Sequence, residues 1–272
     1  MDFKDLIIYS DVDGTLLRSW GEGVKPSVDQ ENIKAIKFFI DNGGHFSIAS
    51  GREYNSIMSF FDYNLNLPIV QSNGAAVYDY AQRKVVYHNY LSIDIKKEII
   101  NLCLKNKKYY LCCGTLDGIY QVDFNDERDT SLHDIERKHV SVDFCLENDL
   151  CKLCYVVDEK DMEDVKKDVD KLKCRKLINA LQSSSIYYEC FDINTSKANG
   201  IKQAIAYSKL TNKTLICIGD YYNDVDMLKI ADIKVCPNNS PDDIKQMCDF
   251  VVSDNNHCAV KDLIYTIYNK KE

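Results

Sequence analysis

The hydrophobic positions in the first part of the chain alternate between short apolar runs and longer amphipathic stretches. Residues 6–10 form an apolar run with β-branched and aromatic members, which is typical of a buried strand. Ile33, Ile36 and Ile40 have the three-to-four spacing of a helix that faces a core. The pattern predicts a helix capped by Ser27 and running to residue 42, a strand at 45–49, a helix at 53–61 and a strand at 68–71. This alternation favours a parallel sheet with helices on both faces.

The pattern changes near residue 80. Strands are predicted at residues 84–90, 109–113, 119–123, 150–157 and 185–191, and helices at 93–106 and 161–173. The charged stretch 125–147 matches neither period, so no element is assigned to it. We interpret this middle segment as an insert of the α+β type.

The first pattern returns after residue 196. It predicts a helix at 198–210, a strand at 215–218, a helix at 225–230, strands at 233–236 and 250–252, and a helix at 260–268. The predicted fold class is therefore α/β, with a doubly wound, mostly parallel, Rossmann-like sheet. Residues 1–80 and 189–272 would form this core, and residues 81–188 the inserted domain.

Composition and charge narrow the range of partners. The chain has 272 residues, of which 45% are hydrophobic, enough for a well-buried fold of one large domain or two. Its net charge of −8 and pI of about 5.2 argue against general binding to nucleic acid or to a membrane surface. No apolar run approaches the roughly 20 residues that span a bilayer, and the N-terminus lacks the features of a secretory signal. We expect a cytoplasmic protein that is a monomer or a weak homo-oligomer.

The twelve cysteines change this picture little. Several lie in strand-like apolar runs, so in the cytoplasm we expect reduced thiols that act as small apolar side chains. Cys151 and Cys154 have the two-residue gap of half a zinc knuckle, but no second pair with suitable spacing follows. A structural role is therefore favoured for both.

Polar side chains follow three of the predicted strands. Asp11 and Asp13 come after the first strand, Ser50 after the second, and Asp220 after the strand at 215–218. In open parallel sheets, ligands bind at this carboxyl edge. If the extended backbone continues, Asp11 and Asp13 lie on the same side, where two anions are costly unless a cation or a proton separates them. The simpler interpretation is an acidic turn, since Asp-Gly is a common turn dipeptide.

More charged groups cluster in the later part of the chain. Asn223 and Asp224 follow Asp220 closely, and three acids from strand ends would make a hard-oxygen site suited to Mg²⁺. Lys197, at the start of a predicted helix, could oppose the charge of a phosphate. Taken alone, this lysine would be interpreted as a solvated surface residue.

These residues occur in an order that resembles a known family. The set Asp11-Val-Asp13-Gly14-Thr15, Ser50, Lys197 and Gly219-Asp220…Asn223-Asp224 is similar to the four motifs of the haloacid dehalogenase-like hydrolases. Ile48-Ala49-Ser50-Gly51-Arg52, Ser72-Asn73-Gly74-Ala75 and the position of the insert resemble the Cof-type branch of sugar-phosphate phosphatases, whose insert is an α/β cap. Each motif alone is weak evidence, but the ordered combination covers the whole chain.

The resemblance implies a phosphatase that uses Mg²⁺ and an aspartyl-phosphate to hydrolyse small phosphorylated metabolites. Asp11 would be the nucleophile, and Asp13 would protonate the leaving alcohol and then activate water. The metal would be held by Asp11, the backbone carbonyl of Asp13, and Asp220. Asp224 would lie behind the metal or anchor Lys197.

The resemblance also implies contacts to the phosphoryl group. Ser50 would donate a hydrogen bond, and Lys197 would neutralise charge in the transition state. The remaining implied contacts are the backbone amides of Val12 and Gly51, and Asn223, which would bind phosphate or orient Asp220. Arg52 would steer an anionic substrate or form a structural ion pair. Asn73 would face the cap or simply form an Asn-Gly turn.

Substrate choice is expected to reside in the insert, because the core recognises only phosphate and metal. Its polar and aromatic candidates are Tyr109, Tyr120, Arg128, His133, Arg137, His139 and Tyr187. Two alternatives stay open: a phosphomutase, which needs a bisphosphate and releases little phosphate, and a non-hydrolytic phospho-acceptor protein. The second is disfavoured because Asp13 would hydrolyse a long-lived phospho-aspartate.

Overall fold

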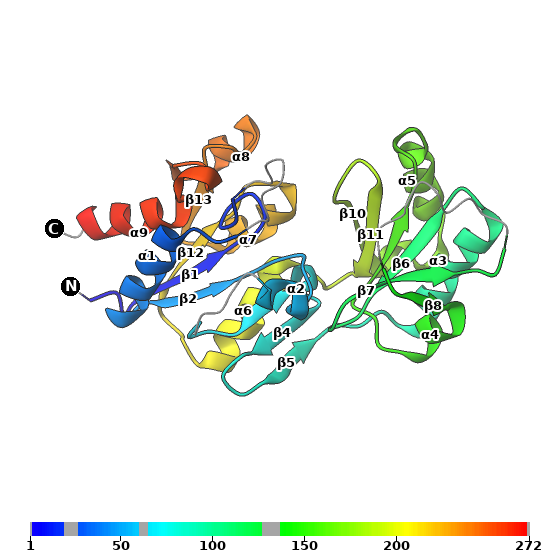
Figure 1. Cartoon of the computed structure of the whole chain (residues 1–272), viewed down its shortest axis with the longest axis horizontal. Helices are drawn as coiled ribbons and strands as arrows, with labels where there is room; N and C mark the ends of the chain where they lie inside the picture. The colour runs from blue at the N-terminus through cyan, green and yellow to red at the C-terminus, as the bar shows by residue number, and fades with distance from the viewer. Residues whose placement is uncertain (1, 19–26, 60–64, 127–136, 271–272) are drawn as a thin grey trace. The chain divides into compact units, whose positions relative to one another are not determined.

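Two structural units are formed by the chain (Figure 1). The computed structural model describes residues 2–18, 27–59, 65–126 and 137–270. The first unit comprises Met1–Arg52, Ser56–Tyr87 and Ser196–Glu272, and the second comprises Glu53–Asn55 and His88–Thr195. These junctions lie beyond residues 80 and 188, where the sequence placed them. The reason is that a hairpin after residue 75 pairs with the first unit, whereas the strand ending at Asp192 pairs with the second.

The first unit is built on a five-stranded parallel sheet in the order β14-β13-β12-β1-β2. The strands are β1 (Leu6–Ser10), β2 (His45–Ile48), β12 (Thr214–Ile218), β13 (Ile233–Pro237) and β14 (Phe250–Val252). The chain leaves β1 toward β2, and β12 pairs with the opposite side of β1. The strand order therefore reverses at β1, and the crevice at its carboxyl end is where such sheets bind ligands.

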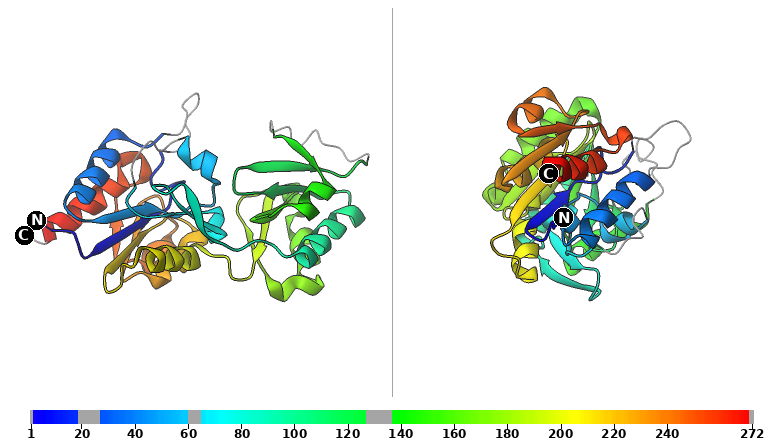
Figure 2. Two further views of the ribbon diagram at one scale, coloured as in Figure 1. Left: turned by 90° about the horizontal axis from the view of Figure 1, so that it is seen from below. Right: turned by 90° about the vertical axis from the view of Figure 1, so that its left-hand side faces the viewer.

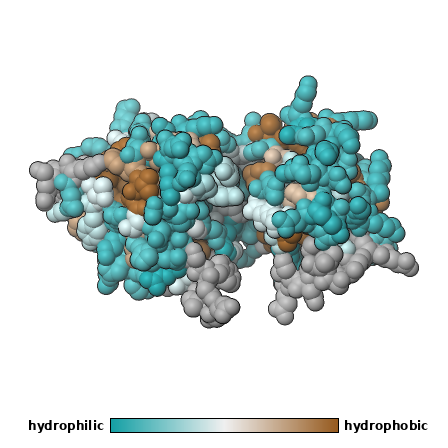
Figure 3. Space-filling model, turned by 90° about the horizontal axis from the view of Figure 1, so that it is seen from above, coloured by the Kyte–Doolittle hydropathy of each residue, from teal (hydrophilic) through white to brown (hydrophobic). Residues whose placement is uncertain are grey.

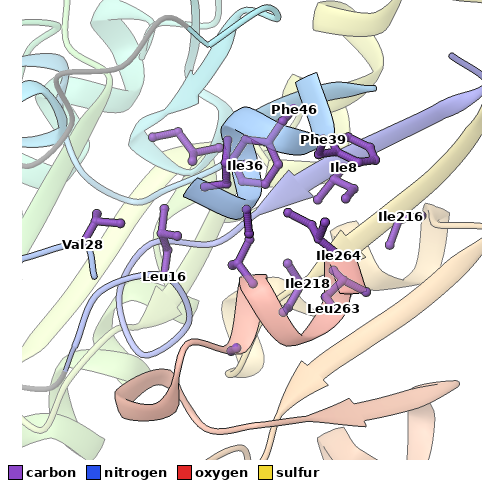
Figure 4. Packing of buried hydrophobic residues seen from close by; sticks show 14 of the residues in the cluster. Ile8, Leu16, Val28, Ile36, Phe39, Phe46, Ile216, Ile218, Leu263 and Ile264 are labelled. Atoms are coloured by element: carbon purple, nitrogen blue, oxygen red, sulfur yellow. The ribbon is translucent and has the colours of Figure 1, made fainter. Parts of the chain in front are cut away.

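Helices cover both faces of this sheet. On one face lie α1 (Gln30–Asp41) and α9 (Ala259–Lys270); on the other lie α6 (Lys197–Ser208), α7 (Val225–Ile230) and α8 (Asp242–Met247). Figure 2 shows α1 in blue and α9 in red on one side of the sheet, with α6 in olive on the other. The period of two in β1 explains this arrangement. Ile8 packs with Phe39 and Ile264 beneath α1 and α9 (Figure 4), whereas Ile7 and Tyr9 belong to the opposite cluster. The predicted doubly wound α/β fold is confirmed.

A smaller sheet continues the first unit beyond β2. It contains β3 (Ile69–Gln71), β4 (Ala76–Asp79) and β5 (Lys84–His88), and an isolated parallel bridge joins Ala49 to Val70. Between β2 and β3 lies the short helix α2 (Tyr54–Met58). The sheet therefore extends from the end of β2 toward the turn at residues 72–74.

The second unit is a six-stranded sheet in the order β10-β11-β9-β6-β7-β8, antiparallel except for the pair β7–β8. Its strands are β6 (Tyr110–Gly114), β7 (Ile119–Asp123), β8 (His139–Ser141), β9 (Lys152–Val156), β10 (Ile178–Gln182) and β11 (Tyr187–Asp192). Its helices are α3 (Ile93–Lys105), α4 (Val142–Glu147) and α5 (Met162–Asp170). They share one core cluster with alternate residues of the strands, such as Leu111 and Leu153. The α+β character expected for the insert is therefore present.

Most of the surface drawn in Figure 3 is hydrophilic. The twelve cysteines are all free thiols, and every one except Cys248 and Cys258 is buried. No helix in the described ranges is both long and apolar enough to cross a membrane.

Several local predictions were wrong. The N-cap of α1 is Asp29, not Ser27: the Asp29 carboxylate accepts a hydrogen bond from the Glu31 amide, and Val28 pairs with Leu17 in a β-bridge. The sequence also missed β4, β8, β10, α4 and α8, all of which have three to six residues and little room for a period to repeat. The predicted end of the helix at 53–61, together with Arg128 and His133, lies outside the described residues.

We expect Phe39→Ala to lower the free energy of unfolding by about 3–5 kcal/mol, because it empties a buried site between α1 and the sheet. The Phe39 ring is fully buried, with its centroid 4.9 Å from that of Phe3. Urea denaturation followed by circular dichroism measures the change. Lys37→Ala, on the exposed side of the same helix, is the control. A loss for Phe39→Ala within about 1 kcal/mol of this control would contradict the assigned packing.

Candidate active site

The loop after β1 bends tightly around the side chain of Asp220. The Asp11 amide still pairs with the Ile218 carbonyl of β12, at 2.8 Å. The chain then turns at Gly14, whose φ of +75° is in the left-handed region. A Cβ at Gly14 would lie only 2.3 Å from Asp220 Oδ2. The Asp-Gly pair in the sequence therefore marks a close approach between the ends of β1 and β12.

Three carboxylates meet at this point. One oxygen each from Asp11, Asp220 and Asp224 lies within 4.8 Å of the others, and no other such cluster of three or more metal-ligating groups occurs among the described residues. Burial, followed by the charge of Asp224, raises the pKa of Asp11 well above its usual range and that of Asp220 to about 7. Hard carboxylate oxygens that repel one another in this way fit a divalent cation. Cys151 and Cys154 are not part of the cluster.

Lys197 supplies the positive charge at the centre of the cluster. Lys197 is the first residue of α6, and its Nζ donates to Asp11 Oδ1 at 2.5 Å and to Asp224 Oδ1 at 2.6 Å. The side chain is completely buried. Burial alone would lower the pKa of Lys197, but the two carboxylates outweigh it and raise the pKa above its usual value. Lys197 is therefore a buried ammonium group, not the solvated lysine that its sequence context alone favoured.

Asp224 shapes the loop that carries Asp220. Its Oδ2 accepts hydrogen bonds from the backbone amides of Asp220 and Tyr221, at 3.0 and 3.1 Å. Its Oδ1 holds Lys197, so both oxygens are engaged. Asn223 lies in the same short 3-10 turn, Tyr222–Asp224, and is half-buried. Of the two roles implied for Asp224, this geometry favours the anchoring of Lys197.

Asp13 is not part of the carboxylate cluster and forms an ion pair with Arg52 instead. The regular strand ends at Ser10, and Asp13 lies in the following turn, so the period of two no longer applies. Its Oδ2 and Oδ1 accept from Arg52 Nε and Nη2 at 2.7 and 2.6 Å. The side chain of Asp13 is 52% exposed and that of Asp11 only 6%. The two aspartates therefore occupy different environments.

Ser50 and Asn73 form a second group beside the end of β1. Ser50 is buried, its carbonyl accepts from the Asn73 amide at 2.9 Å, and its Oγ accepts from the Arg52 amide at 3.2 Å. Asn73 is left-handed, with φ of +53°, and a Cβ at Gly51 would lie 3.2 Å from its side-chain amide. The backbone here is strained for a non-glycine residue, which is common where side chains are positioned for function.

The turn at residues 72–74 also packs against the start of α6. A Cβ at Gly74 would lie 2.0 Å from the Ser196 carbonyl oxygen, so only glycine permits this approach. Ser196 caps α6 by accepting from the Asn199 amide. The turn after β3 is thereby placed beside the helix that carries Lys197.

The sequence implied a phosphate contact from the backbone amide of Val12. The side chain of Val12 is buried.

Two residues of the site were not identified from the sequence. Thr15 Oγ1 donates to Asp220 Oδ1 at 3.2 Å, and its place in the Asp-Gly-Thr motif could have indicated this role. Asn239 Nδ2 donates to the Gly14 carbonyl at 2.8 Å, while its Oδ1 accepts from the Asn255 amide. Nothing in the sequence around Asn239 indicates this long-range contact, since it comes from the loop after β13.

A family model described as haloacid dehalogenase-like hydrolase matches residues 8–264. The chain is 23% identical over 268 residues to 5-amino-6-(5-phospho-D-ribitylamino)uracil phosphatase YitU of Bacillus subtilis, covering 96% of each chain. Among solved structures, BT1666 of Bacteroides thetaiotaomicron, a phosphatase of the haloalkanoate enzyme superfamily, gives a TM-score of 0.77 at 22% identity, over 97% of this chain and 94% of that one. The sugar phosphatase BT4131, of subclass IIB, gives 0.77 at 19%, over 96% and 98%.

We expect Gly14→Ala to weaken binding of a divalent cation at least about tenfold, because the added methyl group would displace Asp220. Titration with Mn²⁺ followed by electron paramagnetic resonance measures this affinity. Gly43→Ala is the matched control: Gly43 is also left-handed, at φ +89°, but lies against Asp2 and Lys4. Equal effects of the two substitutions would mean that backbone strain alone is responsible.

We expect Asp220→Asn to raise the melting temperature of the metal-free protein, and to raise it more at pH 8 than at pH 5. The pKa of Asp220 rises from 3.8 to about 7 in the fold, so the folded state retains a proton that the unfolded state loses. The stability cost of ionising Asp220 therefore grows as pH rises through this interval and is complete above about pH 7. Calorimetry in EDTA at the two pH values measures it. A variant less stable than the wild type at pH 8 would contradict the electrostatic argument.

Proposed function

Because the chain belongs to the haloacid dehalogenase-like hydrolase family, we propose that it is a Mg²⁺-dependent phosphatase of small phosphorylated metabolites. The observation that carries the proposal is the buried Asp11 carboxylate, held by Lys197 beside Asp220 and Asp224. Relatives whose names state phosphatase activity support the reaction type. The sugar phosphatase BT4131, which has the same fold, supports, more weakly, a sugar phosphate as substrate.

In this proposal Asp11 attacks phosphorus and forms an aspartyl-phosphate. Lys197 fixes one oxygen of Asp11 and leaves the other available for the attack. Its ammonium group also stabilises the negative charge that the phosphoryl oxygens gain in the transition state. Complete burial strengthens both effects, because water does not screen the charges there.

A bound Mg²⁺ would be held by Asp11, the carbonyl of Asp13 and Asp220, and would neutralise phosphate charge. Asp224 would act behind this set by holding Lys197 and the loop of Asp220. The phosphoryl group would be contacted, directly or through groups that they orient, by the side chains of Ser50, Asn73 and Asn223 and by the backbone amides of Val12 and Gly51.

Asp13 would serve as the general acid and then as the base. An exposed carboxylate near the nucleophile can exchange its proton with solvent between the two steps. Arg52 now engages both of its oxygens, so Asp13 has to leave this pair before it can protonate a leaving group. Arg52 would therefore hold the acid between turnovers, a role closer to the ion pair than to the steering of an anionic substrate.

The second unit would act as the cap that selects the leaving group. Tyr109 is removed from the candidates, since it lies in the core of that unit and donates to Asp168. Arg137 and Tyr187 remain candidates: they bond each other at 3.1 Å and are only half-buried.

We expect Asp11→Asn to lower phosphate release by about three orders of magnitude or more, because it removes the nucleophile but keeps the shape of the side chain. The test is phosphate release from a panel of phosphorylated sugars, nucleotides and a ribitylaminouracil phosphate, in Mg²⁺ and in EDTA. The expected result is turnover of a few compounds, abolished by EDTA and restored by Mg²⁺.

Substantial turnover by Asp11→Asn, or turnover in EDTA, would contradict the assignment of Asp11 and its neighbours as the active site. No phosphate release by a folded protein that binds Mg²⁺ would instead favour a phosphomutase or a phospho-acceptor protein. Mass spectrometry would then detect phosphate retained on Asp11.

A further inference from the structure

The chain leaves the first unit immediately after Arg52. Residues 50–52 belong to the first unit, Glu53–Asn55 belong to the second, and the first unit resumes at Ser56. Within the second unit, Asn55 Nδ2 donates to the Asp117 carbonyl at 2.7 Å. The residue that holds Asp13 is therefore bonded directly to a segment that is anchored in the other unit.

Glu53 is a second anchor of this segment. Its Oε1 lies 3.3 Å from Lys152 Nζ, which also bonds Glu189 Oε1 at 2.8 Å. The three side chains are each at most 10% exposed. Burial favours the neutral amine, but the carboxylates of Glu189 and Glu53 raise the pKa of Lys152 above its usual value. A charged lysine is therefore buried between two carboxylates.

The ion pair determines where Glu53 stays. Among the described residues, Glu53 Oε1 has no hydrogen-bond partner, so the charge of Lys152 compensates its burial. A buried carboxylate without a compensating cation is strongly unfavourable. Lys152 itself is fixed between strands, because its methylene chain packs on Gly114, where a Cβ would lie 2.8 Å from Lys152 Cγ. Glu53 is thus tied to β9 of the second unit.

We infer that Glu53 is a positioning residue: its pair with Lys152 ties the chain next to Arg52 to the second unit and so controls how Arg52 holds Asp13. The inference rests on the proposed function, in which Asp13 transfers protons. A carboxylate that accepts from a guanidinium group with both oxygens cannot at the same time donate a proton to a leaving group. A shift of Glu53 moves the adjacent backbone of Arg52, and this movement changes how readily the Asp13 carboxylate leaves the Arg52 guanidinium group.

Two matched substitutions separate this role from a structural one. Glu53→Gln and Glu189→Gln each remove one carboxylate charge from the same buried lysine and leave it one partner. Only Glu53 is adjacent to Arg52, whereas Glu189 lies on β11. If the cluster serves stability alone, the two variants have similar kinetics.

The kinetic test compares two substrates whose leaving groups differ in their need for a proton. Release of an alcohol from a hexose phosphate needs a proton from Asp13, whereas release of p-nitrophenolate does not. For Glu53→Gln we expect kcat with a hexose phosphate to fall about tenfold, a part of the effect of general acid–base catalysis, with KM within about twofold. The first-turnover burst with p-nitrophenyl phosphate is expected to stay within about twofold of the wild-type rate. Glu189→Gln is expected to match the wild type in both assays.

In the Asp13→Asn background, Glu53→Gln is expected to cause no further loss, because the two act through one group. Equal effects of the two glutamine substitutions, a slowed burst, or additive losses would overturn the inference.

The ¹⁵N–¹H signal of Arg52 Nε provides a readout that needs no turnover. It is expected to shift in Glu53→Gln and not in Glu189→Gln. If the wild-type protein releases no phosphate, the proposed phosphatase function is contradicted. The Arg52 signal would still decide the positional link, and an unchanged signal would refute it.

Discussion

A single buried ammonium group makes the site of the first unit possible. Lys197 bonds Asp11 and Asp224, and Asp220 lies within reach of both carboxylates. One positive charge among three acids leaves the cluster under-neutralised, and the pKa values of Asp11 and Asp220 are raised as a result of burial and mutual repulsion. The first unit therefore carries an electrostatic cost that a divalent cation, or a proton, relieves. Removing Lys197 would leave buried anions with no local compensation.

The fold accounts for how these groups meet. Asp11 and Asp220 follow neighbouring parallel strands, β1 and β12, at the point where the strand order reverses. Lys197 arrives from the start of α6, which the turn at residues 72–74 locates by packing Gly74 against Ser196. Glycines at 14, 74 and 219 are therefore needed because other backbone or carboxylate atoms occupy the space of a side chain. These glycines are explained by the close approach of neighbouring atoms more than by backbone flexibility.

The sequence predicted much of this arrangement. The bounds of β1, α7 and β14 agree with the predicted ranges, because apolar runs flanked by polar residues are a strong signal. Asp11, Lys197, Asp220 and Asp224 were named in advance and lie together. The expectation that Asp11 and Asp13 share a side depended on an extended backbone, and this condition is not met, because the strand ends at Ser10. Asn239 was missed, because a contact between residues 14 and 239 depends on tertiary structure that no local pattern records.

Each of the two units contains a buried lysine that lies between two carboxylates. In the first unit a buried lysine lies between Asp11 and Asp224, and in the second between Glu53 and Glu189. In each case one carboxylate belongs to a supporting element, while the other belongs to, or adjoins, the proposed catalytic groups. A buried ion pair is a poor source of net stability, because desolvation offsets much of the attraction. It is, however, directional, since moving either partner exposes an uncompensated charge. Both lysines therefore fit a requirement for position: Lys197 would hold Asp11, and Lys152 would hold Glu53, the residue that follows Arg52 in the chain.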